Sequence, residues 1–402
     1  MKRACHDLTP AFAATAFQDD LYRHYRDFLL HTPVFRSDEG VVYLARYGDC
    51  VELLGNPVFR RSAPAGGCSP FSTSQRAPSP LETMINQWMV FMDPPRHDVV
   101  RKAFTQPFTA QSVRQLESLI RAQARQLLDQ LPRDGTVEML EQFAFPLPVT
   151  VIAGILGVPA NDAAMFRAWS AQLTEALDRG NDEDILQGTA VALRFKDYFT
   201  DLIRERNSLP RHCLIRNVMD DPGLALSADE LLYGCIFLLW AGHETTKNLL
   251  ANGIRILAER PAALALLQQQ PELIAKAVEE MLRFESPLQK LSRWAHRDFM
   301  FGDYAVAQGT LVTALIGAAN RDPAVFDRPD TFDIRRTQNR HIAFGAGMHH
   351  CLGAALARLE ARIAFGELLP RLHRLEPAQH RWRTYSAFRS MDSLSVNLLS
   401  IA

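Results

Sequence analysis

The sequence predicts a mainly α-helical protein with small β-sheets. Apolar residues recur at helical spacing in three long segments, at 112–131, 271–285 and 352–365. Runs rich in β-branched and aromatic residues are shorter, at 41–45, 299–313 and 394–401. We find no internal repeat and no long linker, so we expect a single domain over residues 1–402.

Composition and charge narrow the class of protein. The chain is 47% hydrophobic with a formal net charge of −1, which gives no electrostatic reason to expect binding to nucleic acid or to an anionic membrane. Its six cysteines are scattered and form no CxxC pair, a pattern typical of reduced thiols. The first residues contain no apolar run of the kind found in signal peptides. We therefore expect a cytoplasmic monomer without a membrane anchor.

The predicted elements follow in order along the chain. After the strand at 41–45, the Ser-, Pro- and Gly-rich segment at 62–80 predicts a mobile surface loop, either a plain connection or a lid. The run at 231–242 is apolar all round, which indicates a buried helix, and it is too short to span a bilayer. Pro271 suits the first turn of the next helix, and Pro287 ends it. Turn residues at 302–303 and 308–309 divide the β-rich runs of 299–313.

The stretch FGAGMHHCLG, at 344–353, carries the strongest chemical signal. A lone buried cysteine in a turn is the ordinary interpretation, and a zinc site is a second one, since His349, His350 and Cys351 are adjacent. However, neighbouring side chains cannot easily reach one tetrahedral metal. The surrounding glycines let the backbone approach a large flat group, and the helix that follows stabilises a thiolate at its N-terminus. A thiolate held against a flat ligand suggests axial ligation of haem iron.

This stretch resembles the haem-binding signature of the cytochrome P450 family, F-G-x-G-x-[HR]-x-C-x-G. The resemblance implies the cytochrome P450 fold, with haem between a long central helix and the loop that carries Cys351 as axial iron ligand. It is closest to soluble bacterial members. The residues that fill the fixed positions are Phe344, Gly345, Gly347, His349, Cys351 and Gly353.

AGHETT, at 241–246, resembles the oxygen-activation motif of the family's central helix. An acid and a hydroxyl inside an apolar helix must be satisfied or functional. The resemblance implies that Glu244 and Thr245 deliver protons, and that Ala241 and Gly242 border the haem. Gly242 would permit the helix to open there.

Two further sets match family positions. Glu280 and Arg283 form an ExxR pair and Arg336 matches the partner arginine, which implies a structural network. In DPPRHDVVRKAF, His97 and Arg101 lie one helical turn apart, and with Arg293 and His349 they look like partners of the haem propionates.

The resemblance implies a monooxygenase that inserts one oxygen atom from O2 into a C–H bond. It implies heme b (iron protoporphyrin IX) and electrons that pass from NAD(P)H through ferredoxin reductase and ferredoxin. The alternatives are a haem-thiolate sensor or carrier without turnover, which leaves Glu244 and Thr245 unexplained, and a peroxide-dependent member of the family. A zinc or structural helical protein would leave every motif unexplained.

The substrate is predicted to be a mostly apolar small molecule, and the basic residues Arg60, Arg61 and Arg76 favour a carboxylic acid such as a terpenoid acid. Docking of an acidic ferredoxin is expected at the arginines near Cys351, namely Arg335, Arg340, Arg358 and Arg362. The candidate pocket residues are Trp88, Phe91, Phe237, Trp240, Gln289, Leu291 and Phe388.

Overall fold

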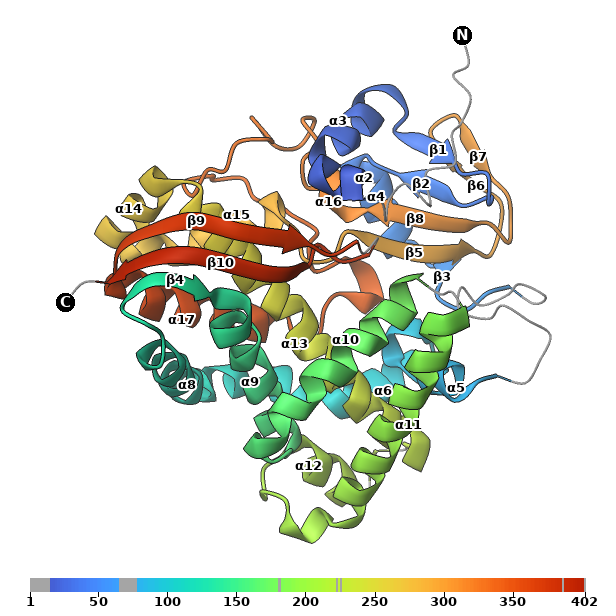
Figure 1. Ribbon diagram of the computed structural model, residues 1–402. Coiled ribbons are helices and arrows are strands. Elements are labelled where there is room, and N and C mark those ends of the chain that lie inside the picture. Colours follow the sequence, from blue (N-terminus) through green and yellow to red (C-terminus); the bar gives the residue numbers. More distant parts are fainter. Residues whose placement is uncertain are drawn as a thin grey trace. The chain divides into compact units, whose positions relative to one another are not determined.

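The computed structural model describes residues 15–64, 78–179, 182–221, 223–224, 226–384 and 387–400. The chain divides into two compact units, and Figure 1 labels the helices and strands that make them up. Unit 1 consists of residues 1–60, 121–144 and 245–402, and unit 2 of residues 61–120 and 145–244. The expectation of one domain over 1–402 stays a prediction.

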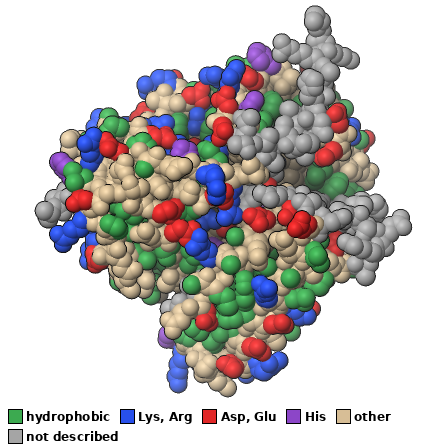
Figure 2. Space-filling view, in the orientation of Figure 1, with side chains coloured by type: hydrophobic (Ala, Val, Ile, Leu, Met, Phe, Trp, Pro, Cys, Tyr) green, Lys and Arg blue, Asp and Glu red, His purple; other side chains and the backbone are tan. Residues whose placement is uncertain are grey.

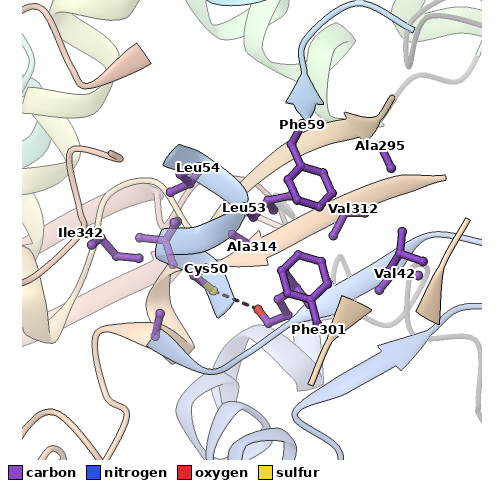
Figure 3. Packing of buried hydrophobic residues seen from close by; sticks show 14 residues of the cluster. Val42, Cys50, Leu53, Leu54, Phe59, Ala295, Phe301, Val312, Ala314 and Ile342 are labelled. Carbon is purple, nitrogen blue, oxygen red and sulfur yellow. Dashed lines mark hydrogen bonds between the residues drawn. The ribbon is translucent and has the colours of Figure 1, made fainter. Parts of the chain in front are cut away.

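A five-stranded sheet forms one core of unit 1. Its strands are, in spatial order, β1 (Val34–Arg36), β2 (Val42–Leu44), β8 (Leu311–Leu315), β5 (Lys290–Ala295) and β3 (Phe59–Arg60). β2 and β8 run parallel and the other neighbours run antiparallel. Helix α4 (Tyr47–Gly55) packs on this sheet through Leu53 and Leu54, and the Cys50 thiol donates to the Leu44 carbonyl at 3.3 Å (Figure 3). Ile342, close to the predicted cysteine ligand in sequence, is buried in the same cluster.

The rest of unit 1 consists of helices and two smaller sheets. One sheet has the order β4 (Asp134–Glu138), β10 (Met391–Ser400), β9 (Leu372–Trp382), and the other pairs β6 (Phe299–Phe301) with β7 (Tyr304–Val306). The helices are α2 (Thr15–Asp19), α3 (Leu21–His31), most of α8 (Glu117–Asp129), a π-turn (Leu140–Ala144), α14 (Pro261–Gln269), α15 (Ile274–Phe284), α16 (Ile316–Ala319) and α17 (Ala354–Leu368). Short 3₁₀ turns cover Pro271–Leu273, Gly347–His349 and Leu369–Arg371.

Unit 2 is built from helices. They are α5 (Pro80–Asn86), α6 (Arg96–Thr105), α7 (Ala110–Gln115), α9 (Pro146–Leu156), α10 (Ala163–Arg179), α11 (Asp182–Arg204) and α12 (Leu214–Asp220), with 3₁₀ turns at Met89–Phe91, Gln106–Phe108, Ala160–Asp162 and Arg206–Ser208. An aromatic core joins α10 to α11, where the rings of Phe166 and Phe195 stack 5.9 Å apart. Leu186 and Leu193 are exposed on α11, and Figure 2 shows hydrophobic side chains gathered among charged ones over these helices.

The long helix α13 (Ala228–Ala258) belongs to both units, through Glu244 to unit 2 and from Thr245 onward to unit 1. It is the buried helix that the apolar run at 231–242 predicts. None of the helices among the described residues is long and apolar enough to cross a membrane.

Several predicted boundaries change in the structure. The helix expected at 112–131 is broken at Leu116 into α7 and α8, and the helix expected at 271–285 begins as a 3₁₀ turn before α15. The expected turns at Gly302 and Gly309 are confirmed, with φ of +57° and +83°. Most of the loop expected at 62–80 lies outside the described residues, and Ser79 already caps α5 with its hydroxyl.

Candidate functional site

Cys351 lies in a tight loop immediately before α17, and we call residues 342–353 the Cys351 loop. The backbone N–H of Cys351 donates to the Phe344 carbonyl at 2.9 Å, and that of His350 donates to the Gly347 carbonyl at 3.0 Å. The Cys351 thiol is exposed, whereas Cys50, Cys213 and Cys235 are buried. An exposed thiol beside a helix N-terminus is in a favourable place for a thiolate.

Two glycines of the Cys351 loop are required by the backbone. Gly345 and Gly347 have φ of +71° and +69°, a region that only glycine adopts without strain. A β-carbon at 347 would overlap the Leu54 carbonyl oxygen and lie 3.1 Å from the Gly55 Cα, because the loop packs closely on the end of α4. Gly353 differs, since a β-carbon there would meet no protein atom within 4 Å.

Helix α13 has one partly exposed stripe in an otherwise buried surface. From Leu231 to Ile254, four residues are half-buried and all the others are buried. The four lie on one side of the helix, at spacings of four, five and eight residues from the first. They are Phe237, Ala241, Gly242 and Thr245. The stripe therefore includes three residues of the predicted oxygen-activation motif.

The two predicted proton-delivering residues have different surroundings. Thr245 is half-buried on the stripe, whereas Glu244 is only 2% exposed and lies off it. The structure gives a steric reason for a glycine at position 242, which the sequence did not indicate. A β-carbon at 242 would lie 2.8 Å from Ile152 Cγ1, so this glycine accommodates the packing of α9.

The four predicted propionate partners lie on different elements. His97 and Arg101 are one turn apart on α6, and His97 is buried with its Nδ1 2.9 Å from Asp98 Oδ1. Arg293 is a buried residue of β5, and His349 ends the 3₁₀ turn of the Cys351 loop. Their convergence on one anionic group stays a prediction.

The ExxR pair and its partner form a buried cluster in unit 1. Arg283 Nε and Nη2 each donate to a Glu280 carboxylate oxygen at 2.8 Å, and both side chains are fully buried. Arg336 Nε donates to the same carboxylate at 3.1 Å. Arg283 also donates to the carbonyls of Asn320 and Pro329. The cluster therefore fixes a long irregular segment before the Cys351 loop.

The pocket candidates of unit 2 form one aromatic cluster. Trp88 is fully buried and its ring lies 5.2 Å from those of both Phe237 and Trp240 and 6.3 Å from that of Phe91. Trp240 Nε1 donates to Thr174 Oγ1 at 2.9 Å. Phe91 and Phe237 are half-buried and are the members of this cluster that a ligand could reach.

The pocket candidates of unit 1 are not equivalent. Leu291 is half-buried near Gly345, and Phe388 bridges to Leu288. Gln289 is buried, and its Nε2 donates to the Ser286 carbonyl at 2.6 Å. Its place in the substrate pocket stays a prediction.

Sequence reasoning missed a second cluster beside the Cys351 loop. It consists of Glu279, His341 and Arg358, in which His341 and Arg358 both hydrogen-bond to the Glu279 carboxylate. Arg358 is also one of the predicted ferredoxin-docking arginines; its guanidinium is paired with Glu279, and its role in docking stays a prediction. The only sequence signal was position, since Glu279 adjoins Glu280 and His341 precedes the haem signature.

Comparisons with known proteins agree with this geometry. The Cytochrome P450 family model matches residues 194–390. The chain is 38% identical over 88% of its length to the "Biotin biosynthesis cytochrome P450" of Bacillus subtilis (strain 168), covering 89% of that protein. It is similar in structure to P450BioI in complex with hexadec-9Z-enoic acid ligated Acyl Carrier Protein, with a TM-score of 0.90, 34% identity and coverage of 96% and 99%. A myxobacterial cytochrome P450 in complex with myristic acid aligns with a TM-score of 0.86, 33% identity and coverage of 96% and 98%.

The chain belongs to the cytochrome P450 family, and it is an oxidoreductase of the monooxygenase type. The family implies haem iron, O2 and reducing equivalents. The residues present fit such a group, because an exposed thiol stands on a glycine-framed loop and the otherwise buried helix α13 has one partly exposed stripe. Among the described residues, no three His, Cys, Asp or Glu side chains come together as a metal site, so the zinc interpretation has no support there.

Proposed function

We propose that this chain is a haem-thiolate monooxygenase that oxidises a C–H bond of a mostly apolar carboxylic acid. The Cys351 thiolate would hold the iron of heme b. The observation that carries the proposal is its exposed thiol, held by Gly345 and Gly347 in a loop fixed to α4. The bound haem supplies the activation of O2, which no side chain can perform.

The chain's own residues hold the cofactor and move protons. His97, Arg101, Arg293 and His349 bind the propionates through their cationic or hydrogen-bonding side chains. Thr245 carries a hydroxyl on the partly exposed stripe of α13. Glu244 supplies protons from its buried position in the same turn.

A cation beside the aromatic cluster supports an acidic substrate. The Arg61 guanidinium carbon lies 4.6 Å from the centroid of the Phe91 ring, and the Arg61 and Ser62 backbone N–H groups are anchored by Asp93 at 2.9 and 2.8 Å. A carboxylate that meets Arg61 would place its apolar part against Phe91 and Phe237. Arg76, the third basic residue of the expected lid, lies outside the described residues.

The acid preference is tested by titrating the haem Soret band with matched pairs of ligands. The probes are myristic acid with myristyl alcohol, and abietic acid with its alcohol, so that fatty and terpenoid skeletons are separated. Arg61→Gln should raise the Kd of the acids roughly ten- to hundredfold, because a charge-assisted hydrogen bond contributes about 1.5–3 kcal/mol. The alcohols should be unaffected. Arg211→Gln, at an exposed arginine of the same unit outside the expected lid, is the control. Equal binding of acids and alcohols by the unmodified protein would contradict the proposal.

The electron donor in this proposal is a ferredoxin supplied by its reductase and NAD(P)H. Its docking candidates are Arg335, Arg340, Arg358 and Arg362. A sensor or a peroxide-dependent enzyme is a weaker alternative, because neither needs a hydroxyl such as that of Thr245 on the stripe.

A further inference from the structure

Three side chains from three parts of unit 1 meet beside the Cys351 loop. Glu279 lies on α15, Arg358 lies on α17, and His341 directly precedes the loop. Arg358 Nε and Nη2 donate to the two carboxylate oxygens of Glu279 at 2.7 and 2.9 Å, which is a bidentate pair. His341 Nε2 lies 3.0 Å from Glu279 Oε2. We call Glu279, His341 and Arg358 the loop clamp.

The hydrogen bonds of the loop clamp indicate which His341 nitrogen is protonated and why Glu279 is ionised. The Ala343 backbone N–H donates to His341 Nδ1 at 3.3 Å, so Nε2 carries the proton that is donated to Glu279. Burial alone would raise the pKa of the Glu279 carboxyl, but the hydrogen bonds from His341 and Arg358 outweigh it and lower this pKa to about 2. Glu279 is therefore a carboxylate at neutral pH, and its two partners are held by it.

Phe344 connects the loop clamp to the cysteine. The Arg358 guanidinium carbon lies 4.4 Å from the centroid of the Phe344 ring, and the His341 ring lies 6.0 Å from it. The Phe344 carbonyl accepts the hydrogen bond from the Cys351 N–H, and the Phe344 ring lies 6.4 Å from that of His350, next to Cys351. Movement of Phe344 would therefore be transmitted directly to the thiolate.

We propose that the loop clamp is a positioning device: it holds Phe344, and with it the backbone that carries Cys351, so that the sulfur stays in place as the iron ligand. The inference rests on the proposed function, because it requires Cys351 as the iron ligand. Exposure and hydrogen bonds to a metal-bound sulfur are levers on reduction potential. A sulfur displaced from this place would donate less to iron, which moves the midpoint potential in the positive direction.

The test replaces Glu279 by Gln, which keeps the size of the side chain and removes the charge that holds Arg358. The matched control is Glu367→Gln on α17, the helix that carries Arg358, since Glu367 likewise binds arginines, Arg121 and Arg125, at 2.6 and 2.8 Å. We measure the midpoint potential by spectroelectrochemistry and the rate at which the ferrous–CO band converts from about 450 nm to about 420 nm. Glu279→Gln should shift the potential positive and speed the conversion severalfold. Glu367→Gln should leave both unchanged, and equal effects in the two variants would overturn the inference.

A double-mutant cycle shows whether the effect passes through Phe344. In a Phe344→Leu background, Glu279→Gln should produce no further shift in potential. The same shift with and without the aromatic ring would indicate a direct effect of charge and would contradict positioning. The spectrum of the unmodified protein is recorded first. If it lacks the band near 450 nm, the proposed function fails; if it has the band and Glu279→Gln leaves the potential unmoved, the inference alone fails.

Discussion

Thr245 is the residue whose position says most about proton delivery. Of the four residues on the partly exposed stripe of α13, Thr245 alone carries a hydroxyl. Its neighbour Thr246 is only 3% exposed. These two adjacent threonines therefore form a matched pair for mutation, since Thr245 lies on the partly exposed stripe and Thr246 is buried.

Thr245→Ala should keep substrate binding but divert reducing equivalents to hydrogen peroxide. Proton transfer by a positioned group typically contributes about 10²–10⁴ in rate. The measurement is product and peroxide formed for each NAD(P)H consumed. Thr246→Val should retain the yield of the unmodified protein. An unchanged yield in Thr245→Ala would remove Thr245 from the mechanism.

Single residues differ in how far sequence alone can place them. Six fixed positions within ten residues identify the segment around Cys351, because the chemistry requires those residue types in that order. Glu279 and Arg358 could not be paired in advance, because their contact joins two helices that are far apart in sequence. The hydrogen bond from the Gln289 amide to the Ser286 carbonyl could not be predicted either, because no local pattern shows it.

At the scale of elements, the Cys351 loop is fixed by its contact with α4. Gly347→Ala should destabilise the protein, because it combines a φ of +69° with an overlap on the Leu54 carbonyl. Backbone strain of this kind costs about 1–3 kcal/mol. The check is the free energy of unfolding in denaturant, with Gly366→Ala in α17 as control. A β-carbon at 366 meets nothing within 4 Å, so that change should be neutral or stabilising by up to about 1 kcal/mol. Equal stability of Gly347→Ala and the unmodified protein would contradict this account of the loop.

Two adjacent glutamates of helix α15 bind side chains from two different segments of the chain. Residues i and i+1 of a helix point about 100° apart, so Glu279 and Glu280 face different neighbours. Glu280 holds Arg283 and Arg336, whereas Glu279 holds His341 and Arg358. The helix thus fixes both the irregular segment and the cysteine loop that follows it.

Helices with a clear apolar period and strands with clear turn signals could be predicted, and their irregularities could not. The strands β6, β7 and β8 fall where Gly302 and Gly309 indicate turns. β9 was missed because Leu372–Trp382 contains a proline and several charges, and only its pairing with β10 explains it. The break at Leu116 was also missed, because the apolar period continues across it.

For the whole molecule, the mainly α fold with small sheets is confirmed by the structure and by its similarity to solved cytochrome P450 structures. The net charge gave no electrostatic reason to expect nucleic acid or an anionic membrane as a partner, and composition carried no information on haem. That conclusion came from the motifs, whose order along the chain matches the family. The substrate could not be predicted, since the candidate lining is mostly apolar and aromatic side chains that are equally typical of a core.

The most direct measurement is the absorption spectrum of the purified protein, expressed with ample iron, reduced with dithionite and exposed to CO. The account predicts a band near 450 nm in the unmodified protein and its loss in Cys351→Ser. A band near 420 nm in the unmodified protein, or a band near 450 nm that survives in Cys351→Ser, would contradict the assignment of Cys351 as the thiolate ligand.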